Sequence, residues 1–277
     1  MRLEKEGNNI QDILAILVPK FIKDRMNQGL NFLQEAQDDV GIIFCDICDF
    51  DKIIKSEGQR IVQILDEIFR NFDNLCLKHG IQKIETVGKT YMACAGLKLC
   101  EVNFPEQVLK TEKTRRMVSM ALEMMKYIQS LTYGKGEVIK IKIGIHNGRV
   151  ISGVIGDHKP QFSLIGDTVN TTSRVCSTGV DGSIIISEEA YENVKNSNIT
   201  FEQRVVQAKG KGDLITYVVL NQKKIKKFKK SKLKMKIEMH MPGLLLYILL
   251  TISNYLFELI EKPSRDQKGL RTNKTRQ

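Results

Sequence analysis

The segment that most restricts the fold is a short, continuous run of apolar residues at 40–45. A run without alternating polar side chains is typical of a strand that is buried on both faces of a sheet. The chain has 277 residues, of which 42% are hydrophobic and 27% are charged, so it is long enough for a core of that kind. The run predicts a layered protein of strands and helices, and the composition excludes a wholly disordered or collagen-like chain.

The order of strand and helix patterns after this run predicts the topology. Apolar residues at helical spacing indicate a helix over 58–78 that stops at His79-Gly80. Strands at 81–87 and 90–95 have only Gly88-Lys89 between them, which is hairpin spacing. Pro105 opens a long helix to about Leu131. The remaining elements are strands at 138–145 and 150–155 with a turn at Asn147-Gly148, a helix capped by Asp167 or Thr168 and ending at Val175, a strand at 184–186, a helix at 188–195, and strands at 201–206 and 215–220. This β-α-β-β-α-β order predicts one α/β (α+β) domain with a ferredoxin-like core and a mixed sheet.

The charge is divided sharply along the chain. The formal net charge is +11, yet residues 1–220 hold 28 basic and 28 acidic side chains, and residues 221–277 hold 15 and 4. A neutral body argues against nucleic acid as a partner, and a lysine cluster at 223–236 favours anionic lipid headgroups. The uncharged stretch 239–257 is long enough to span a membrane or to lie at its interface.

These shifts in composition predict five parts of the chain. They are an N-terminal helix at 1–30, a folded domain at 31–220, a lysine-rich linker at 221–238, a membrane-spanning or interfacial helix at 239–260, and a basic disordered tail at 261–277. We therefore expect a membrane-associated protein whose folded domain lies in the cytoplasm.

Six cysteines occur without an N-terminal apolar signal segment, which favours reduced thiols over disulfides. Cys45 and Cys48 form a CxxC pair, but a zinc site needs a second pair at similar spacing, and the other cysteines are scattered. Cys45 is better interpreted as part of the buried strand.

Three carboxylates follow the buried run within six residues, at Asp46, Asp49 and Asp51. Divalent cations prefer oxygen ligands, and the end of a buried strand is a common place to hold one. An acidic turn without a ligand is the alternative. Both interpretations are open at this point.

Two further segments have the chemistry to contact a phosphorylated ligand. Asn170 and Arg174 are four residues apart in a predicted helix and share one face. An amide and a guanidinium placed in this way can hold a sugar oxygen and a phosphate oxygen. The run 209–213, Lys-Gly-Lys-Gly-Asp, is a basic glycine loop suited to a phosphate contact.

Glu85 occupies a strand whose other residues are expected to be buried. A carboxylate in such a position needs a partner, which could be a ligand or a buried lysine.

Five motifs in order resemble the catalytic domains of class III nucleotide cyclases. They lie at 44–47, 84–92, 143–150, 162–170 and 209–214, and the resemblance covers about residues 10–220. It implies the class III cyclase fold and the conversion of a nucleoside triphosphate to a 3′,5′-cyclic monophosphate and pyrophosphate. It also implies Mg²⁺ or Mn²⁺ as cofactor and sites shared between two domains of a dimer, in intracellular signalling.

The resemblance assigns roles residue by residue. Asp46 matches a carboxylate that binds both catalytic metals, and the Ile47 carbonyl matches a further ligand. Asn170 and Arg174 match the pair that stabilises the transition state. Lys209 matches a lysine that contacts the terminal phosphates.

Base recognition is implied at two positions. Glu85 matches the glutamate of guanylate cyclases, where adenylate cyclases have lysine. A carboxylate suits the N1–H and N2–H donors of guanine, whereas a lysine suits the N1 acceptor of adenine. Ser163 occupies the second base-reading position and is neither the usual cysteine nor the usual aspartate. Arg149 matches an arginine that some cyclases direct at phosphate. GTP is therefore the predicted substrate, and ATP is the alternative.

One position departs from the family pattern. The second metal-binding carboxylate follows the hairpin glycine in the family, but here the pair is Gly88-Lys89. An ammonium in place of a carboxylate changes the local charge by two units. We therefore expect a heterodimer, in which a second cyclase domain brings the metal carboxylates, rather than a homodimer. The alternative is a regulatory cyclase-homology domain with impaired catalysis.

Overall fold

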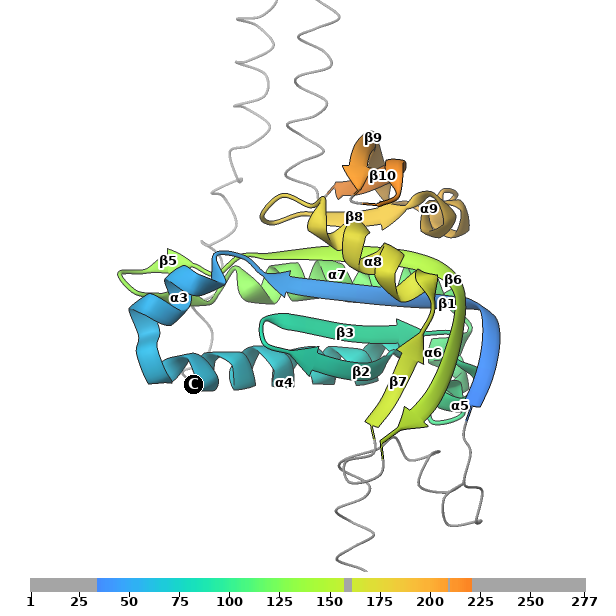
Figure 1. The fold of residues 1–277 in the computed structure, drawn as a ribbon, viewed down its shortest axis with the longest axis horizontal. Helices are drawn as coiled ribbons and strands as arrows, with labels where there is room; N and C mark the ends of the chain where they lie inside the picture. The colour runs from blue at the N-terminus through green and yellow to red at the C-terminus, as the bar shows by residue number, and fades with distance from the viewer. Residues whose placement is uncertain (1–33, 157–160, 209, 221–277) are drawn as a thin grey trace, which may run out of the picture. The chain divides into compact units, whose positions relative to one another are not determined.

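The structure is a computed structural model that describes residues 34–156, 161–208 and 210–220. Within these residues one sheet has the strand order β2-β3-β1-β6-β8-β10-β9, with β7 paired to β6 off this path (Figure 1). The pairs are antiparallel except for β6 with β8. The four strands of the predicted β-α-β-β-α-β core have the order β2-β3-β1-β6, which confirms the ferredoxin-like core, and the parallel pair of β6 with β8 makes the sheet mixed as predicted.

The strands of the described residues are β1 (Gln34–Ile47), β2 (Gln82–Val87), β3 (Thr90–Ala95), β4 (Thr132–Tyr133), β5 (Glu137–Val138), β6 (Ile141–Ile155), β7 (Gln161–Ile165), β8 (Ile184–Ser187), β9 (Thr200–Ala208) and β10 (Gly212–Leu220). The helices are α3 (Phe50–Glu57), a 3₁₀ turn η1 (Gly58–Arg60), α4 (Ile61–His79), α5 (Lys98–Glu101), α6 (Glu106–Leu109), α7 (Lys113–Ile128), α8 (Asp167–Ser177) and α9 (Glu188–Val194).

Strand β1 lies at the centre of the sheet and is buried as predicted. Ile43, Cys45 and Ile47 face a core that contains side chains from α4, α7 and α9. Val40 and Ile42 face a second, smaller cluster on the other side of the sheet. Because successive side chains of a strand alternate between faces, β1 contributes to both layers.

Helix α8 packs on the face opposite α4 and α7, and a glycine lets it approach closely. A Cβ built on Gly144 would lie 2.4 Å from the backbone nitrogen of Cys176 in α8. Any larger residue at this position of β6 would collide with the backbone of the helix. Gly144 therefore sets the height of α8 above the sheet.

The predicted turn at Asn147-Gly148 is wrong, because both residues lie within the continuous strand β6. Asn147 is buried and accepts a hydrogen bond from Thr114 Oγ1 at 3.3 Å. A Cβ on Gly148 would lie 2.6 Å from Oγ1 of Thr168. The pair therefore serves close packing between layers rather than chain reversal.

The single helix predicted from Pro105 to about Leu131 is also wrong, because two helices, α6 and α7, occupy this region. Glu112 caps α7, and its carboxylate accepts hydrogen bonds from the backbone N–H groups of Thr114 and Arg115, both at 2.9 Å. This local cap starts a new helix, which the apolar periodicity alone did not indicate.

Other boundaries differ in smaller ways. Helix α8 begins after Gly166, so neither Asp167 nor Thr168 is its cap residue. The strand predicted at 138–145 is divided between β5 and the start of β6, and β7 and α3 were not predicted. Helix α4 ends as expected at Gly80, which has a φ of 62°.

The six cysteines are all free and buried, in agreement with the expectation of reduced thiols. Among the described residues no helix is both long enough and apolar enough to cross a bilayer. The segments predicted at 1–30, 221–238, 239–260 and 261–277 lie outside the described residues.

The close approach of α8 gives a first prediction. Gly144→Ala should lower the free energy of unfolding by about 3 kcal/mol, because the backbone of α8 must shift to admit a methyl group. Chemical denaturation measures this change. The control is Gly182→Ala, where φ is +70° and nothing lies within 4 Å of the added Cβ. It should cost about 1 kcal/mol of backbone strain only. Equal losses for both variants would contradict the packing argument.

A second prediction concerns the start of α9. A hydrogen bond from His146, at 3.3 Å, lowers the pKa of Glu189 to about 2 from an ordinary value of 4.5. A lowered folded-state pKa stabilises the fold above the ordinary value, and this stabilisation is lost as the pH falls from 4.5 to about 2. Because the side chain of Glu189 is 62% exposed, we expect only about 1 kcal/mol. Urea unfolding should therefore show that the free energy of unfolding of the wild type exceeds that of Glu189→Gln above this pH range and that the difference disappears across it. A difference that is constant with pH would refute the lowered pKa of Glu189.

Candidate functional site

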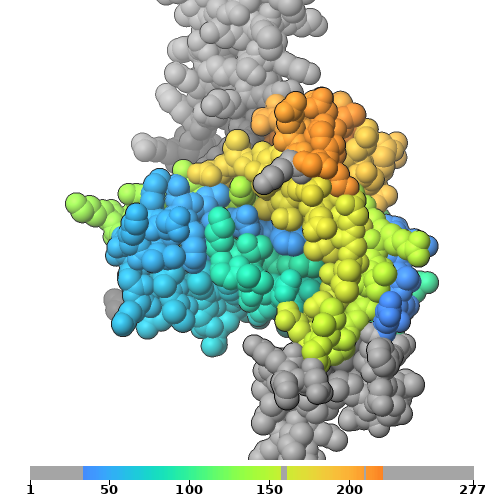
Figure 2. All heavy atoms as spheres, viewed as in Figure 1, coloured from blue at the N-terminus to red at the C-terminus, as the bar shows by residue number. Residues whose placement is uncertain are grey.

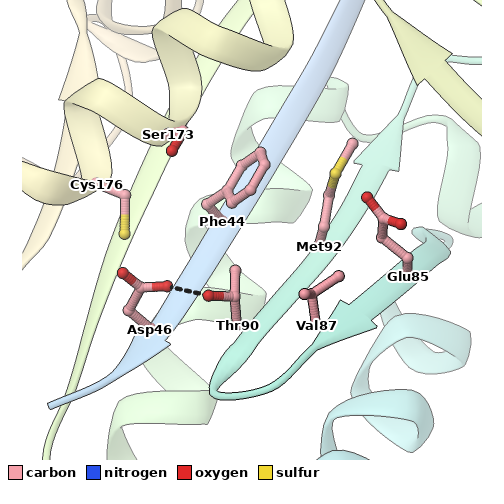
Figure 3. A pocket seen from close by; sticks show the side chains of 8 residues that line it. All are labelled: Phe44, Asp46, Glu85, Val87, Thr90, Met92, Ser173 and Cys176. Carbon is pink, nitrogen blue, oxygen red and sulfur yellow. Dashed lines mark hydrogen bonds between the residues drawn. The ribbon is translucent and has the colours of Figure 1, made fainter.

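A pocket of about 250 Å³ opens on the α8 face of the sheet. It lies between β1, the β2–β3 hairpin and α8, where the space-filling view shows a hollow with β1 at its floor (Figure 2). Its walls are formed by Phe44, Asp46, Glu85, Val87, Thr90, Met92, Ser173 and Cys176 (Figure 3). Two predicted site residues, Asp46 and Glu85, are therefore brought into one pocket.

Asp46 is the last pocket-facing residue of β1. Its Oδ1 accepts a hydrogen bond of 2.7 Å from Oγ1 of Thr90, which lies directly opposite on β3. The thiol of Cys176 points toward Asp46 from α8 (Figure 3). Burial, and then the charge of Asp46, raise the pKa of Cys176 to about 12, so this thiol stays neutral.

Ile47 and Lys89 adjoin Asp46 through the backbone. The side chain of Ile47 is 2% exposed and lies in the core, so only its main-chain atoms are available to a ligand. Its N–H donates to the carbonyl of Lys89 at 3.1 Å. The residue that departs from the family pattern thus lies directly beside the end of β1.

The other two acidic residues do not join Asp46. Asp49 adopts a left-handed conformation with φ 51° at the start of α3, and its carboxylate pairs with Lys52 at 3.1 Å. Asp51 is exposed within α3. The described part of the chain contains no group of three or more His, Cys, Asp or Glu side chains that could hold a metal ion. Asp46 is thus the single carboxylate of the three that lines the pocket, and one carboxylate is too few to form a site for two divalent cations.

Glu85 projects from β2 into the pocket and is half-buried. Its Oε2 accepts a hydrogen bond of 2.7 Å from Nε2 of Gln161, at the start of β7. Among the described residues the nearby Lys83 is not its partner, because Lys83 pairs with Asp73 instead, at 2.8 Å. No pattern in the sequence indicated a role for Gln161, since β7 itself was not predicted.

Ser163 lies two residues beyond Gln161 on β7 and is half-buried. Strand alternation places both residues on one face of β7. Ser163 does not line the pocket of Asp46 and Glu85.

Asn170 and Arg174 lie one turn apart on α8, as predicted. Asn170 is exposed and Arg174 is half-buried, and neither lines the pocket, although their neighbour Ser173 does. The loop between β9 and β10 approaches this part of α8. A Cβ on Gly210 would lie 3.7 Å from Nη2 of Arg174.

An ion pair ties that loop to the first turn of α8. Nζ of Lys211 contacts Oδ2 of Asp167, and this hydrogen bond lowers the pKa of Asp167. The sequence did not indicate this pair. The lysine predicted to contact phosphate was Lys209, which lies outside the described residues.

Arg149 is not brought to the pocket. Its side chain is 72% exposed, and its Nε lies 3.4 Å from Oδ1 of Asp38. Within the described residues, Asp46 and Glu85 therefore form one group, and Asn170, Arg174 and Arg149 lie outside their pocket.

Comparison with known proteins agrees with the motifs. The chain is 34% identical over 239 residues to guanylate cyclase beta of Plasmodium falciparum (isolate 3D7), an alignment covering 76% of this chain and 8% of that protein. It is 32% identical over 227 residues to the germination-specific adenylate cyclase of Dictyostelium discoideum, covering 80% of this chain and 25% of that protein. The chain thus spans about a quarter or less of the length of these relatives.

The fold agrees as well. A crystal structure of the guanylate cyclase domain of RhGC from Catenaria anguillulae in complex with GTP superposes with a TM-score of 0.60 at 30% identity, covering 67% of this chain and 98% of that one. Residues 32–221 match the family described as the adenylate and guanylate cyclase catalytic domain. With its strand order, its pocket and this match over most of its length, the chain belongs to the family of adenylate and guanylate cyclase catalytic domains.

Proposed function

We propose that the chain is one half of a dimeric guanylate cyclase that converts GTP to 3′,5′-cyclic GMP and pyrophosphate. The observation that carries this proposal is the carboxylate of Glu85, which faces the pocket and is held there by Gln161. The relatives include both guanylate and adenylate cyclases, so the choice of base rests on this site rather than on overall similarity.

The chemistry of Glu85 favours guanine. A carboxylate only accepts hydrogen bonds, and each of its oxygens has two lone pairs. The amide of Gln161 occupies one acceptor position on Oε2 and orients the group. The remaining positions suit the adjacent N1–H and N2–H donors of guanine, whereas N1 of adenine is itself an acceptor. Ser163 can donate or accept, so it favours neither base.

Asn170 and Arg174 suit the reacting end of the nucleotide. Cyclisation requires the ribose 3′-oxygen to attack the α-phosphorus while pyrophosphate departs. Arg174 would donate to the oxygens of the α-phosphate as charge develops there, and Asn170 would hold a ribose oxygen. Lys209 would neutralise the terminal phosphates, and Arg149 is a further candidate for a phosphate contact.

The distribution of these residues supports a site shared between two domains. Asp46 and Glu85 line one pocket, but Asn170 and Arg174 lie outside it. A second domain is therefore needed to bring all of these groups to one nucleotide. We expect Mg²⁺ or Mn²⁺ to depend mainly on the carboxylates of that domain, because the described part of this chain offers only Asp46 and the Ile47 carbonyl. A homodimer would repeat the Lys89 departure in both sites, so we favour a heterodimer.

A second candidate function follows from Lys89. Lys89 brings a positive charge next to the end of β1 where the family has a carboxylate, and this charge would oppose the binding of a divalent metal at Asp46. The chain would then be a regulatory cyclase-homology domain that binds nucleotide or a partner without turnover.

Removing the carboxylate of Glu85 tests the choice of base. Glu85→Gln should weaken the binding of a GTP analogue by about 10- to 100-fold, since a hydrogen bond to a charged group is worth about 1.5–3 kcal/mol. The binding of an ATP analogue should change little. Fluorescence titration of both analogues measures this, with Glu106→Gln, an exposed residue of α6, as the control. Unchanged preference in Glu85→Gln would remove the basis for a guanylate cyclase.

Restoring a carboxylate at Lys89 tests the metal argument. The purified protein is assayed with Mn²⁺ and GTP, alone and mixed with a cyclase domain that carries both metal carboxylates. We expect cyclic GMP only from the mixture, and we expect Lys89→Asp to raise the activity of the chain alone at least about 10-fold. Lys110→Asp, at another exposed lysine, should have no such effect.

The outcomes separate the two candidates. Cyclic GMP from no combination would reject the catalytic proposal and leave the regulatory one. Activity in the mixture together with an inert Lys89→Asp would show that Lys89 does not disable the metal site.

A further inference from the structure

Strand β2 contains a β-bulge immediately before Glu85. Lys83 lies opposite Ala93 and Glu85 lies opposite Met92, so Ile84 is an extra residue in the ladder. A bulge of this kind sets two consecutive residues of one strand against a single residue of its partner.

The bulge sends Lys83 and Glu85 to opposite faces of the sheet. Ala93 belongs to the core that contains α4 and α7, whereas Met92 lines the pocket. Residues directly opposite each other share a face, so Lys83 faces α4 and Glu85 faces the pocket. In a regular strand, residues two apart share a face. Without the bulge, Lys83 would therefore lie beside Glu85 on the pocket side.

The hairpin turn already fixes the direction of Glu85. Val87 pairs with Thr90 across the two-residue turn, and Glu85 follows in register with Met92. The bulge therefore determines which face of the sheet Lys83 and Ile84 occupy. A regular ladder would pair Ile84 with Ala93, on the core side. It would pair Lys83 with Cys94, on the pocket side of the sheet.

Contacts with α4 hold Lys83 away from the pocket. Its Nζ lies 2.8 Å from Oδ2 of Asp73 and 5.4 Å from the ring centre of Tyr91. The hydroxyl of Tyr91 donates to Oδ1 of Asp73 at 2.7 Å. We call Asp73, Lys83 and Tyr91 the Asp73 clamp. Both carboxylate oxygens of Asp73 are thus engaged by the β2–β3 hairpin.

The clamp is anchored in the buried core through Tyr91. Tyr91 is 1% exposed, and its ring packs edge-on against Phe72 with 5.5 Å between ring centres. Its hydroxyl also lies 3.2 Å from Sγ of Cys76. Asp73 is therefore oriented by a buried hydroxyl, although Asp73 and Lys83 are themselves 40% and 36% exposed.

We infer that the Asp73 clamp determines base specificity by keeping the ammonium of Lys83 off the pocket face, an inference that rests on the guanine-reading role of Glu85 proposed above. A lysine beside Glu85 would pair with the carboxylate and compete with the donors of guanine. It would also offer the donor that N1 of adenine accepts. Asp73 and Lys83 act through Glu85 and are positioning residues, not catalytic ones.

The test breaks the clamp without removing Lys83 or Glu85. In the full chain, Asp73→Asn should lower the preference for a GTP analogue over an ATP analogue by about 10-fold, measured by fluorescence titration. The control is Asp66→Asn, which makes the same change on the same helix at a carboxylate paired with Arg70 at 2.8 Å. An unchanged preference in Asp73→Asn would overturn the inference.

A double variant separates this effect from a loss of stability. If the released ammonium is the cause, Asp73→Asn/Lys83→Met should regain the wild-type preference to within about 3-fold, because methionine keeps much of the chain length without the charge. A double variant no better than Asp73→Asn would show that the ammonium is not responsible and would overturn the inference.

The strand register gives a readout that needs no nucleotide. Cross-strand NMR contacts should place Lys83 opposite Ala93 in the wild type and opposite Cys94 in Asp73→Asn. If the wild type binds neither nucleotide, the proposed function is rejected but the inference about the clamp is not. The strand register of β2, compared between the wild type and Asp73→Asn, still tests the role of the clamp. Asp73→Asn with the wild-type register would defeat the clamp.

Discussion

Strand β1 is paired along both edges, with β3 from Gly41 to Asp46 and with β6 from Gln34 to Ile47. This double pairing leaves each side chain of β1 only one of two directions, into the core beneath α4 and α7 or toward α8. Asp46 is placed on the α8 side because Cys45 and Ile47 are required in the core. The position of the acidic group in the pocket is thus a consequence of the burial of its two neighbours. Helix α8 closes over the same face because Gly144 admits its backbone.

The central strand and the β2–β3 hairpin were predictable from the sequence because their signals are local. A continuous apolar run and a two-residue Gly-Lys turn each restrict a short stretch of chain regardless of its neighbours. Helix α4 was predictable for a similar reason, since its apolar period ends at a glycine. The prediction of a turn at Asn147-Gly148 was wrong because a glycine is also found where two layers pack closely. Only the position of Thr168 beside Gly148 shows that close packing is its role here.

The candidate site was predictable in its residue types but not in its contacts. Glu85 and Asp46 could be selected because the family motifs contain them. Gln161 could not, since its contact with Glu85 depends on the pairing of β7, far along the chain. The bulge at Ile84 was equally hidden, because the run Lys83-Ile84-Glu85 has the alternation of a regular strand. Only the pairing partners on β3 show that Lys83 and Glu85 face opposite ways.

Control of positive charge connects these features. Lys83 is paired with Asp73, Lys211 with Asp167, and Nζ of Lys142, which lies across from Asp46, reaches the carbonyl of Ser177 at 3.4 Å. Each of these ammonium groups has a partner outside the pocket, so the carboxylates of Asp46 and Glu85 are not paired with them. If Glu85 reads the base as proposed, one ammonium moved by a single strand position in this pocket of about 250 Å³ would change the preferred base. On this proposal the register of β2 determines chemical selectivity, even though Asp73, Lys83 and Tyr91 do not line the pocket.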